Sequence, residues 1–166
     1  MSAPSIRALL VDDEVLSRLP LRQALAAHAD VEIVGECVNA AEAQQAIQAR
    51  APDLLFLDIR MPGMDGFKLL HQLRPQALPM VVFTTAYGQH ALRAFDAGAL
   101  DYVLKPIDQA RFDQALERVR RHWHGLQSPA ATSAHAGHLL RISVRVGEHI
   151  RVVAVDAIHW IRADAN

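Results

Sequence analysis

The 166-residue sequence is poor in several features that mark particular classes of protein. Its one cysteine, Cys37, excludes an intramolecular disulfide framework, and its place in an apolar run predicts a core residue in a reducing compartment. A formal net charge of -1 excludes a uniformly basic nucleic-acid-binding surface. No apolar run approaches the roughly 20 residues that span a bilayer, and acidic residues at 12–14 interrupt the N-terminal run, unlike a signal peptide. We therefore expect a cytoplasmic protein without a membrane partner.

Short apolar runs alternate with segments of helical periodicity. The runs have the length of buried strands and cover residues 6–11, 31–38, 54–57, 80–84 and 100–104. The helical segments cover residues 15–28, 40–50, 64–73, 89–97 and 109–124. This order predicts right-handed crossovers, a parallel sheet and helices on both of its faces.

Single residues predict where the helices begin and end. Asn39 and Glu42 have the spacing of a capping box, and Asp108 can cap the last helix. Gly98 predicts a left-handed end to the fourth helix. Pro20 lies inside the first helical segment, so we expect that helix to start late or to bend there.

The composition changes after residue 124. We assign residues 1–124 to one domain, residues 125–138 to a linker rich in Ser, Pro, Ala, Thr and His, and residues 139–166 to a β segment. Apolar and polar residues alternate over 140–146, as in a half-buried strand, and two more strands are expected near 150–155 and 158–161. Such a small piece is marginal alone, so it docks on the first domain, pairs with another chain, or opens a domain that this chain does not complete.

Polar side chains with compatible chemistry follow four of the predicted strands. Asp12 and Asp13 follow the first run, and Asp58 follows the third. Thr85 follows the fourth run, and Lys105 follows the fifth. Because ligands of open parallel sheets bind at the carboxyl ends of the strands, we expect these groups to converge on one edge.

The chemistry of such a cluster is restrictive. Two carboxylates about 4 Å apart repel by roughly 4 kcal/mol at an effective dielectric constant of about 20, so three of them require a cation. Oxygen ligands select Mg²⁺ or Mn²⁺ before zinc. The chain has only two lysines, Lys68 and Lys105, among 17 basic residues, which suggests a need for a compact point charge at position 105. A carboxylate beside Mg²⁺ and a lysine is a plausible nucleophile for phosphoryl transfer.

Four motifs together resemble the receiver domain of bacterial two-component response regulators, over residues 5–122. They are VDDE at 11–14, LDIRMPGMDG at 57–66, TTAY at 84–87 and KP at 105–106. The resemblance implies a (βα)5 fold, a doubly wound parallel sheet of the flavodoxin-like receiver type. With the C-terminal antiparallel β segment, this gives an α/β protein.

The resemblance also implies roles for individual residues. Asp58 would accept a phosphoryl group from a sensor histidine kinase. The carboxylates of Asp12, Asp13 and Asp58 and the backbone carbonyl of Arg60 would surround Mg²⁺. Lys105 would bind the phosphate, and its bond to the following proline is expected to be cis.

Two further residues would convert phosphorylation into a change of surface. The resemblance implies that Thr85 is the switch hydroxyl and Tyr102 the switch aromatic. Thr85 would move toward the phosphoryl group, and the ring of Tyr102 would turn into the space that it leaves. Such a protein is a signalling switch rather than an enzyme, although it catalyses its own phosphoryl transfer and slow dephosphorylation.

Other segments resemble one subfamily. FTTAY at 83–87 and HALRAF at 90–95 are similar to receivers of LytTR (LytR/AlgR-type) transcription regulators. Residues 139–166, with IHWIRAD at 158–164, resemble the first strands of that family's DNA-binding domain, which is longer. The resemblance implies transcription control, a homodimer, and DNA binding by a full-length parent but not by this chain, which we expect to be a fragment or truncated product.

The sequence has three alternative interpretations. The first alternative is a stand-alone receiver that acts through protein contacts alone. It would be favoured if the full-length parent did not bind promoter DNA in an electrophoretic mobility shift assay. A haloacid-dehalogenase-type phosphatase needs a second aspartate two residues after the nucleophile, where this chain has Arg60. Four histidines near the linker lack a regular ligand spacing for a metal site: His122, His124, His135 and His138.

Overall fold

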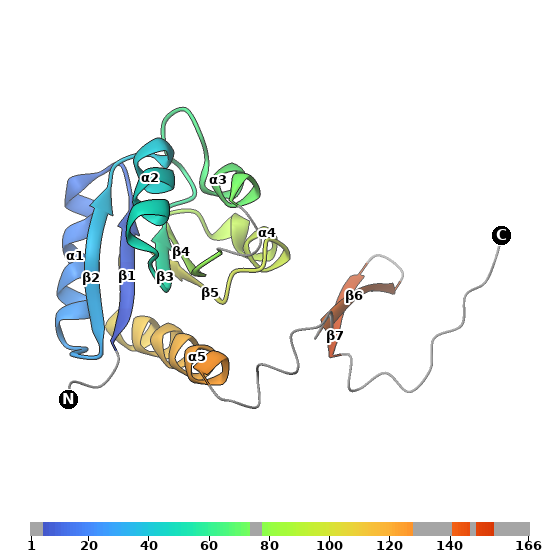
Figure 1. The fold of residues 1–166 in the computed structure, drawn as a ribbon. Coiled ribbons are helices and arrows are strands. Elements are labelled where there is room, and N and C mark those ends of the chain that lie inside the picture. The colour runs from blue at the N-terminus through green and yellow to red at the C-terminus, as the bar shows by residue number, and fades with distance from the viewer. Residues whose placement is uncertain (1–4, 74–77, 128–140, 147–148, 155–166) are drawn as a thin grey trace. The chain divides into compact units, whose positions relative to one another are not determined.

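A computed structural model describes residues 5–73, 78–127, 141–146 and 149–154 (Figure 1). The chain divides into two compact units, Met1–His124 and Gly125–Asn166. Most of the predicted linker and the strand expected at 158–161 lie outside the described residues.

Five parallel strands form the sheet of the first unit, in the order β2-β1-β3-β4-β5. The elements alternate along the chain (Figure 1): β1 (Ile6–Val11), α1 (Val15–Ala26), β2 (Val31–Cys37), α2 (Ala40–Arg50), β3 (Leu54–Leu57), α3 (Gly66–Gln72), β4 (Met80–Thr85), α4 (Ala91–Asp96), β5 (Asp101–Leu104) and α5 (Gln109–Gln127). This strand order confirms the predicted doubly wound (βα)5 sheet of the flavodoxin-like type. In the second unit, β6 (Arg141–Val146) pairs with β7 (His149–Ala154) in antiparallel fashion.

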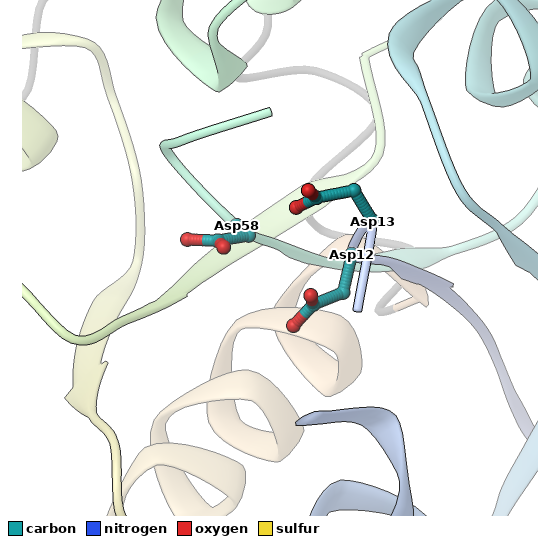
Figure 2. A group of neighbouring side chains, drawn as sticks. All are labelled: Asp12, Asp13 and Asp58. Carbon is teal, nitrogen blue, oxygen red and sulfur yellow. The ribbon is translucent and has the colours of Figure 1, made fainter. Parts of the chain in front are cut away.

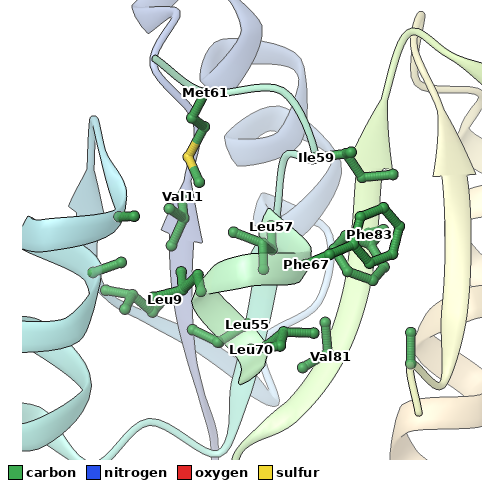
Figure 3. Packing of buried hydrophobic residues seen from close by; sticks show 14 of the residues in the cluster. Leu9, Val11, Leu55, Leu57, Ile59, Met61, Phe67, Leu70, Val81 and Phe83 are labelled. Atoms are coloured by element: carbon green, nitrogen blue, oxygen red, sulfur yellow. The ribbon is translucent and has the colours of Figure 1, made fainter. Parts of the chain in front are cut away.

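Two apolar layers cover the sheet. One contains Leu9 and Val11 of β1 and packs beneath α2, α3 and α4, with Phe67 of α3 against Phe83 of β4 (Figure 3). The other contains the alternate β1 residue Leu10 and packs beneath α1 and α5. β1, β3 and β4 are buried on both faces, so their sequences are largely apolar, apart from Arg7 in β1 and the two threonines that end β4. This is why short apolar runs predicted these strands.

Side chains cap three of the helices. The Asn39 Oδ1 accepts from the Glu42 N–H at 2.8 Å, and the Asp108 Oδ1 accepts from the Arg111 N–H at 2.9 Å. Both predicted caps are confirmed, although Glu42 reaches back to the N–H of Val38 rather than to that of Asn39. The third cap is Asp65, whose Oδ1 accepts from the main-chain N–H of Lys68 in the first turn of α3.

Other helix ends differ from the sequence-based expectations. A late start or a bend of α1 at Pro20 was expected; the helix begins at Val15 and runs through Pro20, so the late start is excluded. The carbonyl left without a donor by this proline belongs to Leu16, a residue that is 77% exposed, so water can reach that turn. The segment 89–97 is a 3-10 turn, η2 (Gly88–His90), followed by α4. Gly98 ends α4 at φ +82°, as predicted.

Helix α5 ends later than the sequence predicted, whereas the single cysteine lies where it was expected. Helix α5 extends to Gln127, three residues into the predicted linker. Cys37 is buried, as expected. Within the described part of the chain, none of the helices combines the length and the apolarity needed to cross a bilayer.

A buried carboxylate organises the edge strand β5. The side chain of Asp101 is fully buried and pairs with the guanidinium groups of Arg111 and Arg118 of α5. Its Oδ1 also accepts from the main-chain N–H of Tyr102 at 2.7 Å, while Arg111 donates to the main-chain carbonyl of Tyr102 at 2.7 Å. Both main-chain groups of Tyr102 are therefore bonded to side chains of the same unit, which protects this edge from pairing with another strand.

We predict that Asp101→Ala lowers the free energy of unfolding by about 2–4 kcal/mol, because it strips a buried N–H and two arginines of their acceptor. Asp101→Asn keeps one acceptor oxygen and should lower the free energy of unfolding by less than Asp101→Ala does. Asp30→Ala breaks the exposed pair with Arg120 and should cost at most about 1 kcal/mol. Urea unfolding of the three variants measures the order, and equal midpoints for Asp101→Ala and Asp30→Ala would contradict it.

Candidate functional site

Three carboxylates meet at the carboxyl edge of the sheet. Asp12 and Asp13 follow β1, and Asp58 follows the neighbouring strand β3 (Figure 2). One oxygen from each carboxylate lies within 4.8 Å of the others. Asp12 and Asp58 are buried and Asp13 is partly exposed, so the cluster lies at the surface end of the core.

All four polar groups of Asp12 have partners in the structure. Its N–H donates to the carbonyl of Cys37 at 3.0 Å, and its carbonyl accepts from the guanidinium of Arg18. Its Oδ1 accepts from the N–H of Glu14 at 3.0 Å, and its Oδ2 accepts from the ammonium of Lys105 at 2.6 Å. The corner between β1 and α1 is therefore closely fixed.

Lys105 brings a positive charge from β5 to this cluster. Its Nζ lies 2.6 Å from Asp12 and 3.3 Å from Asp58, and its main-chain N–H donates to the carbonyl of Thr85 at 2.9 Å. The bond between Lys105 and Pro106 is cis, as expected.

Burial and charge compete in setting the pKa values of this group. Burial raises the pKa of Asp58 above its ordinary value; the positive charge of Lys105 opposes the shift, and the negative charge of Asp12 adds to it. Burial lowers the pKa of Lys105, but its hydrogen bond to Asp12 and the charges of Asp58 and Asp12 outweigh burial and raise it. Lys105 therefore stays charged at neutral pH.

The two predicted switch residues lie beside the cluster without bonding to it. The Oγ1 of Thr85 is buried and has no hydrogen-bond partner among the described residues. The ring of Tyr102 is buried, and its hydroxyl donates to the main-chain carbonyl of Tyr87. Burial is also the main cause that raises the pKa of Tyr102.

Sequence reasoning did not find the side-chain contacts of two arginines at this site. Arg60 was expected to contribute its backbone carbonyl, but its guanidinium also stacks over the ring of Tyr87, at 4.4 Å from the centroid. The main-chain N–H of Arg60 donates to the Asp58 Oδ1 at 3.4 Å. Arg18 was not singled out at all, although it is buried. Its position three residues before Leu21, on the apolar stripe of α1, is the signal that could have found it.

A cleft of about 580 Å³ opens over the cluster. Asp13, Asp58 and Lys105 line its polar part. Leu16 and Pro20 of α1 and Ile107 of the β5–α5 loop line its apolar part. The cleft therefore joins a charged pocket to an exposed apolar surface.

The donor set fits a hard divalent cation. All three side chains offer oxygen, and a single ammonium cannot balance three carboxylates within 4.8 Å of one another. Mg²⁺ also favours sites with few protein ligands and a phosphate oxygen as a further ligand, which an open cleft allows.

Comparison with known proteins gives a consistent result. The family model for the response regulator receiver domain matches residues 8–117. An uncharacterized response regulatory protein of Shewanella oneidensis is 39% identical over 162 residues, which cover 97% of this chain and 67% of that protein. The transcriptional regulatory protein BtsR of Escherichia coli is 47% identical over 116 residues, covering 70% of this chain and 48% of that protein. The chain thus matches about half the length of this second relative.

Solved structures agree with this result. The response regulatory domain of mrkE from Klebsiella pneumoniae superimposes with a TM-score of 0.64 at 32% identity, over 71% of this chain and 98% of that chain. The REC domain of AraT from Geobacillus stearothermophilus gives a TM-score of 0.67 at 28% identity, over 74% and 98% of the two chains.

Repulsion within the carboxylate cluster leads to a prediction about stability. We expect Asp13→Asn to raise the free energy of unfolding in EDTA by about 1 kcal/mol, because it removes one of three mutually repelling charges. The same variant should lose most of the stabilisation that Mg²⁺ gives to the wild type. Asp96→Asn, an exposed charge on α4, is the matched control. Urea unfolding with and without Mg²⁺ tests both points, and an Asp13→Asn variant that matches the wild type in both media would refute them.

Proposed function

The chain belongs to the response regulator receiver domain family, and on that premise we propose that it accepts a phosphoryl group on Asp58 from a sensor histidine kinase and thereby controls transcription. The observation that carries the proposal is the position of the Asp58 carboxylate. It lies at the end of a central strand, grouped with Asp12 and Asp13, 3.3 Å from the ammonium of Lys105 and open to the cleft.

The chemistry of the transfer follows from the charges around Asp58. A carboxylate oxygen of Asp58 forms a bond to phosphorus while the bond from phosphorus to the donor imidazole nitrogen breaks. Lys105 lies where it can stabilise negative charge on the equatorial phosphoryl oxygens. The carboxylates of Asp12, Asp13 and Asp58 and the carbonyl of Arg60 would hold Mg²⁺, which supplies further positive charge to the same oxygens.

Phosphorylation would change the charge of the site and would offer a hydrogen-bond acceptor to the hydroxyl of Thr85. A phosphoryl group on Asp58 carries close to two negative charges and adds three acceptor oxygens. The Thr85 Oγ1, which lacks a partner among the described residues, can donate to one of them. Movement of Thr85 would let Tyr102 shift its ring, and the surface of α4, β5 and α5 would change with it.

A transcriptional output is supported by the relatives. The relative from Shewanella oneidensis aligns over 97% of this chain, well past the receiver, and BtsR is named a transcriptional regulatory protein. We place the β segment from residue 139 in a DNA-binding domain of the LytTR type. Phosphorylation of Asp58 would then shift the equilibria of homodimer formation and of DNA binding.

The apolar side of the cleft fits the phosphodonor partner. On α1, Val15 is 61%, Leu16 77% and Leu19 43% exposed, and Leu16 lines the cleft that opens to Asp58. Exposed apolar side chains next to a reactive group mark a protein-binding surface. The kinase would bury these side chains while presenting its phosphohistidine to Asp58.

The first test concerns the acceptor. Asp58→Asn should abolish labelling by acetyl phosphate in the presence of Mg²⁺, because an amide is not a nucleophile for phosphorus. Asp96→Asn should label like the wild type. Intact-protein mass spectrometry reads the added phosphoryl group, and a label that persists on Asp58→Asn would sink the assignment.

A second test separates docking from chemistry. Leu16→Glu should slow transfer from a phosphorylated sensor kinase on the order of 10-fold, since a charge would have to be buried in the interface, while labelling by acetyl phosphate stays unchanged. Leu126→Glu, at an exposed leucine of α5, serves as the control. Radiolabel transfer assays measure both rates, and an unaltered transfer rate for Leu16→Glu would exclude this docking surface.

A further inference from the structure

Arg18 is a buried cation that the proposed phosphoryl transfer does not use. It is 6% exposed and lies on the core-facing side of α1 with Leu21 and Leu25. A buried guanidinium is costly unless its donors are paired, so its presence among apolar neighbours calls for a specific role.

The guanidinium of Arg18 joins three elements of the fold. From α1, its Nη1 donates to the main-chain carbonyl of Asp12, at the end of β1. Its Nε donates to the Oε2 of Glu36 on β2 at 2.8 Å. Glu36 is held in turn by Arg22, whose Nε lies 3.4 Å from the Oε1. The planar fork of an arginine suits such a bridge, because its donors have fixed relative directions.

The acceptor carbonyl has a particular place in the site. It belongs to the peptide group that joins Asp12 to Asp13, so a fixed carbonyl direction also fixes the plane from which Asp13 departs. The preceding peptide group is fixed as well, because the N–H of Asp12 donates to Cys37 on β2 at 3.0 Å. Both peptide groups that flank Asp12 are therefore tied down, one by a strand and one by Arg18.

We propose that Arg18 is a positioning residue for the divalent-cation site: it holds the Asp12–Asp13 peptide so that both carboxylates face Asp58. The inference rests on the proposed function only in assuming that this cluster binds a cation. At the cluster, the hydrogen bond of Arg18 goes to the main-chain carbonyl of Asp12 and not to a carboxylate oxygen of Asp12, so Arg18 acts through the orientation of the ligands. Outer partners of this kind typically change metal affinity 10- to 100-fold when they are removed.

Binding of Mn²⁺ to the full chain tests the inference without any phosphoryl transfer. Free Mn²⁺ is measured by electron paramagnetic resonance during titration of the wild type, Arg18→Gln and Arg22→Gln. We expect Arg18→Gln to raise the dissociation constant on the order of 10-fold. Arg22→Gln removes a charge from the same helix. Among the described residues Arg22 pairs with Glu36 alone, so this variant should stay within about 2-fold of the wild type.

A conservative variant separates geometry from charge. Arg18→Lys keeps the positive charge but cannot reach the carbonyl of Asp12 and the carboxylate of Glu36 as a fork, so we expect an affinity close to that of Arg18→Gln. Full recovery of Mn²⁺ affinity by lysine would overturn the positioning role. Circular dichroism of each metal-free variant reports the folded fraction, and affinities are compared for folded protein only.

Glu36→Gln covers the case in which Arg18→Gln does not fold. It leaves Arg18 in place with a neutral acceptor, and a smaller loss of Mn²⁺ affinity is expected. Wild-type affinity in Arg18→Gln, or in Glu36→Gln if the former is unfolded, would overturn the inference while leaving labelling of Asp58 intact. A wild type that fails to bind Mn²⁺ would overturn both the cation site and the role of Arg18.

Discussion

Repulsion among three carboxylates is the unfavourable interaction that the rest of the structure must offset. Asp12, Asp13 and Asp58 bring oxygens within 4.8 Å of one another because β1 and β3 are adjacent parallel strands that end together. Both strands are buried on two faces, so neither can withdraw from the edge without exposing core residues. The hydrophobic core thus holds in place an arrangement of charges that electrostatics alone would disperse.

The single positive charge of Lys105 balances only part of the negative charge of the three carboxylates. Burial raises the pKa of Asp58, in spite of the ammonium 3.3 Å away. A carboxylate with a raised pKa is a stronger base and a stronger nucleophile than a solvated one once it is ionised. The unbalanced negative charge that makes the metal-free cluster unfavourable is the same property that favours a bound cation.

Sequence patterns predicted the sheet and the cluster better than the contacts that support them. β1 and β3 were visible because burial on both faces makes them largely apolar, and the aspartates were visible because they directly follow these strands. Arg18 escaped notice because a charged residue on an apolar stripe has no partner that the sequence reveals: Glu36 lies 18 positions away on another element. The stacking of Arg60 on Tyr87 and the burial of Asp101 likewise depend on side-chain conformations that no local pattern encodes.

The anchoring of Tyr102 on β5 has a consequence for how a signal could leave the site. Its N–H and carbonyl are bonded to Asp101 and Arg111, while its hydroxyl has a separate bond to the carbonyl of Tyr87. Rotation of the ring about its own side-chain bonds therefore sacrifices one hydroxyl contact and no main-chain bond. The ring of Tyr102 can therefore change its orientation while the main chain of β5 stays in place.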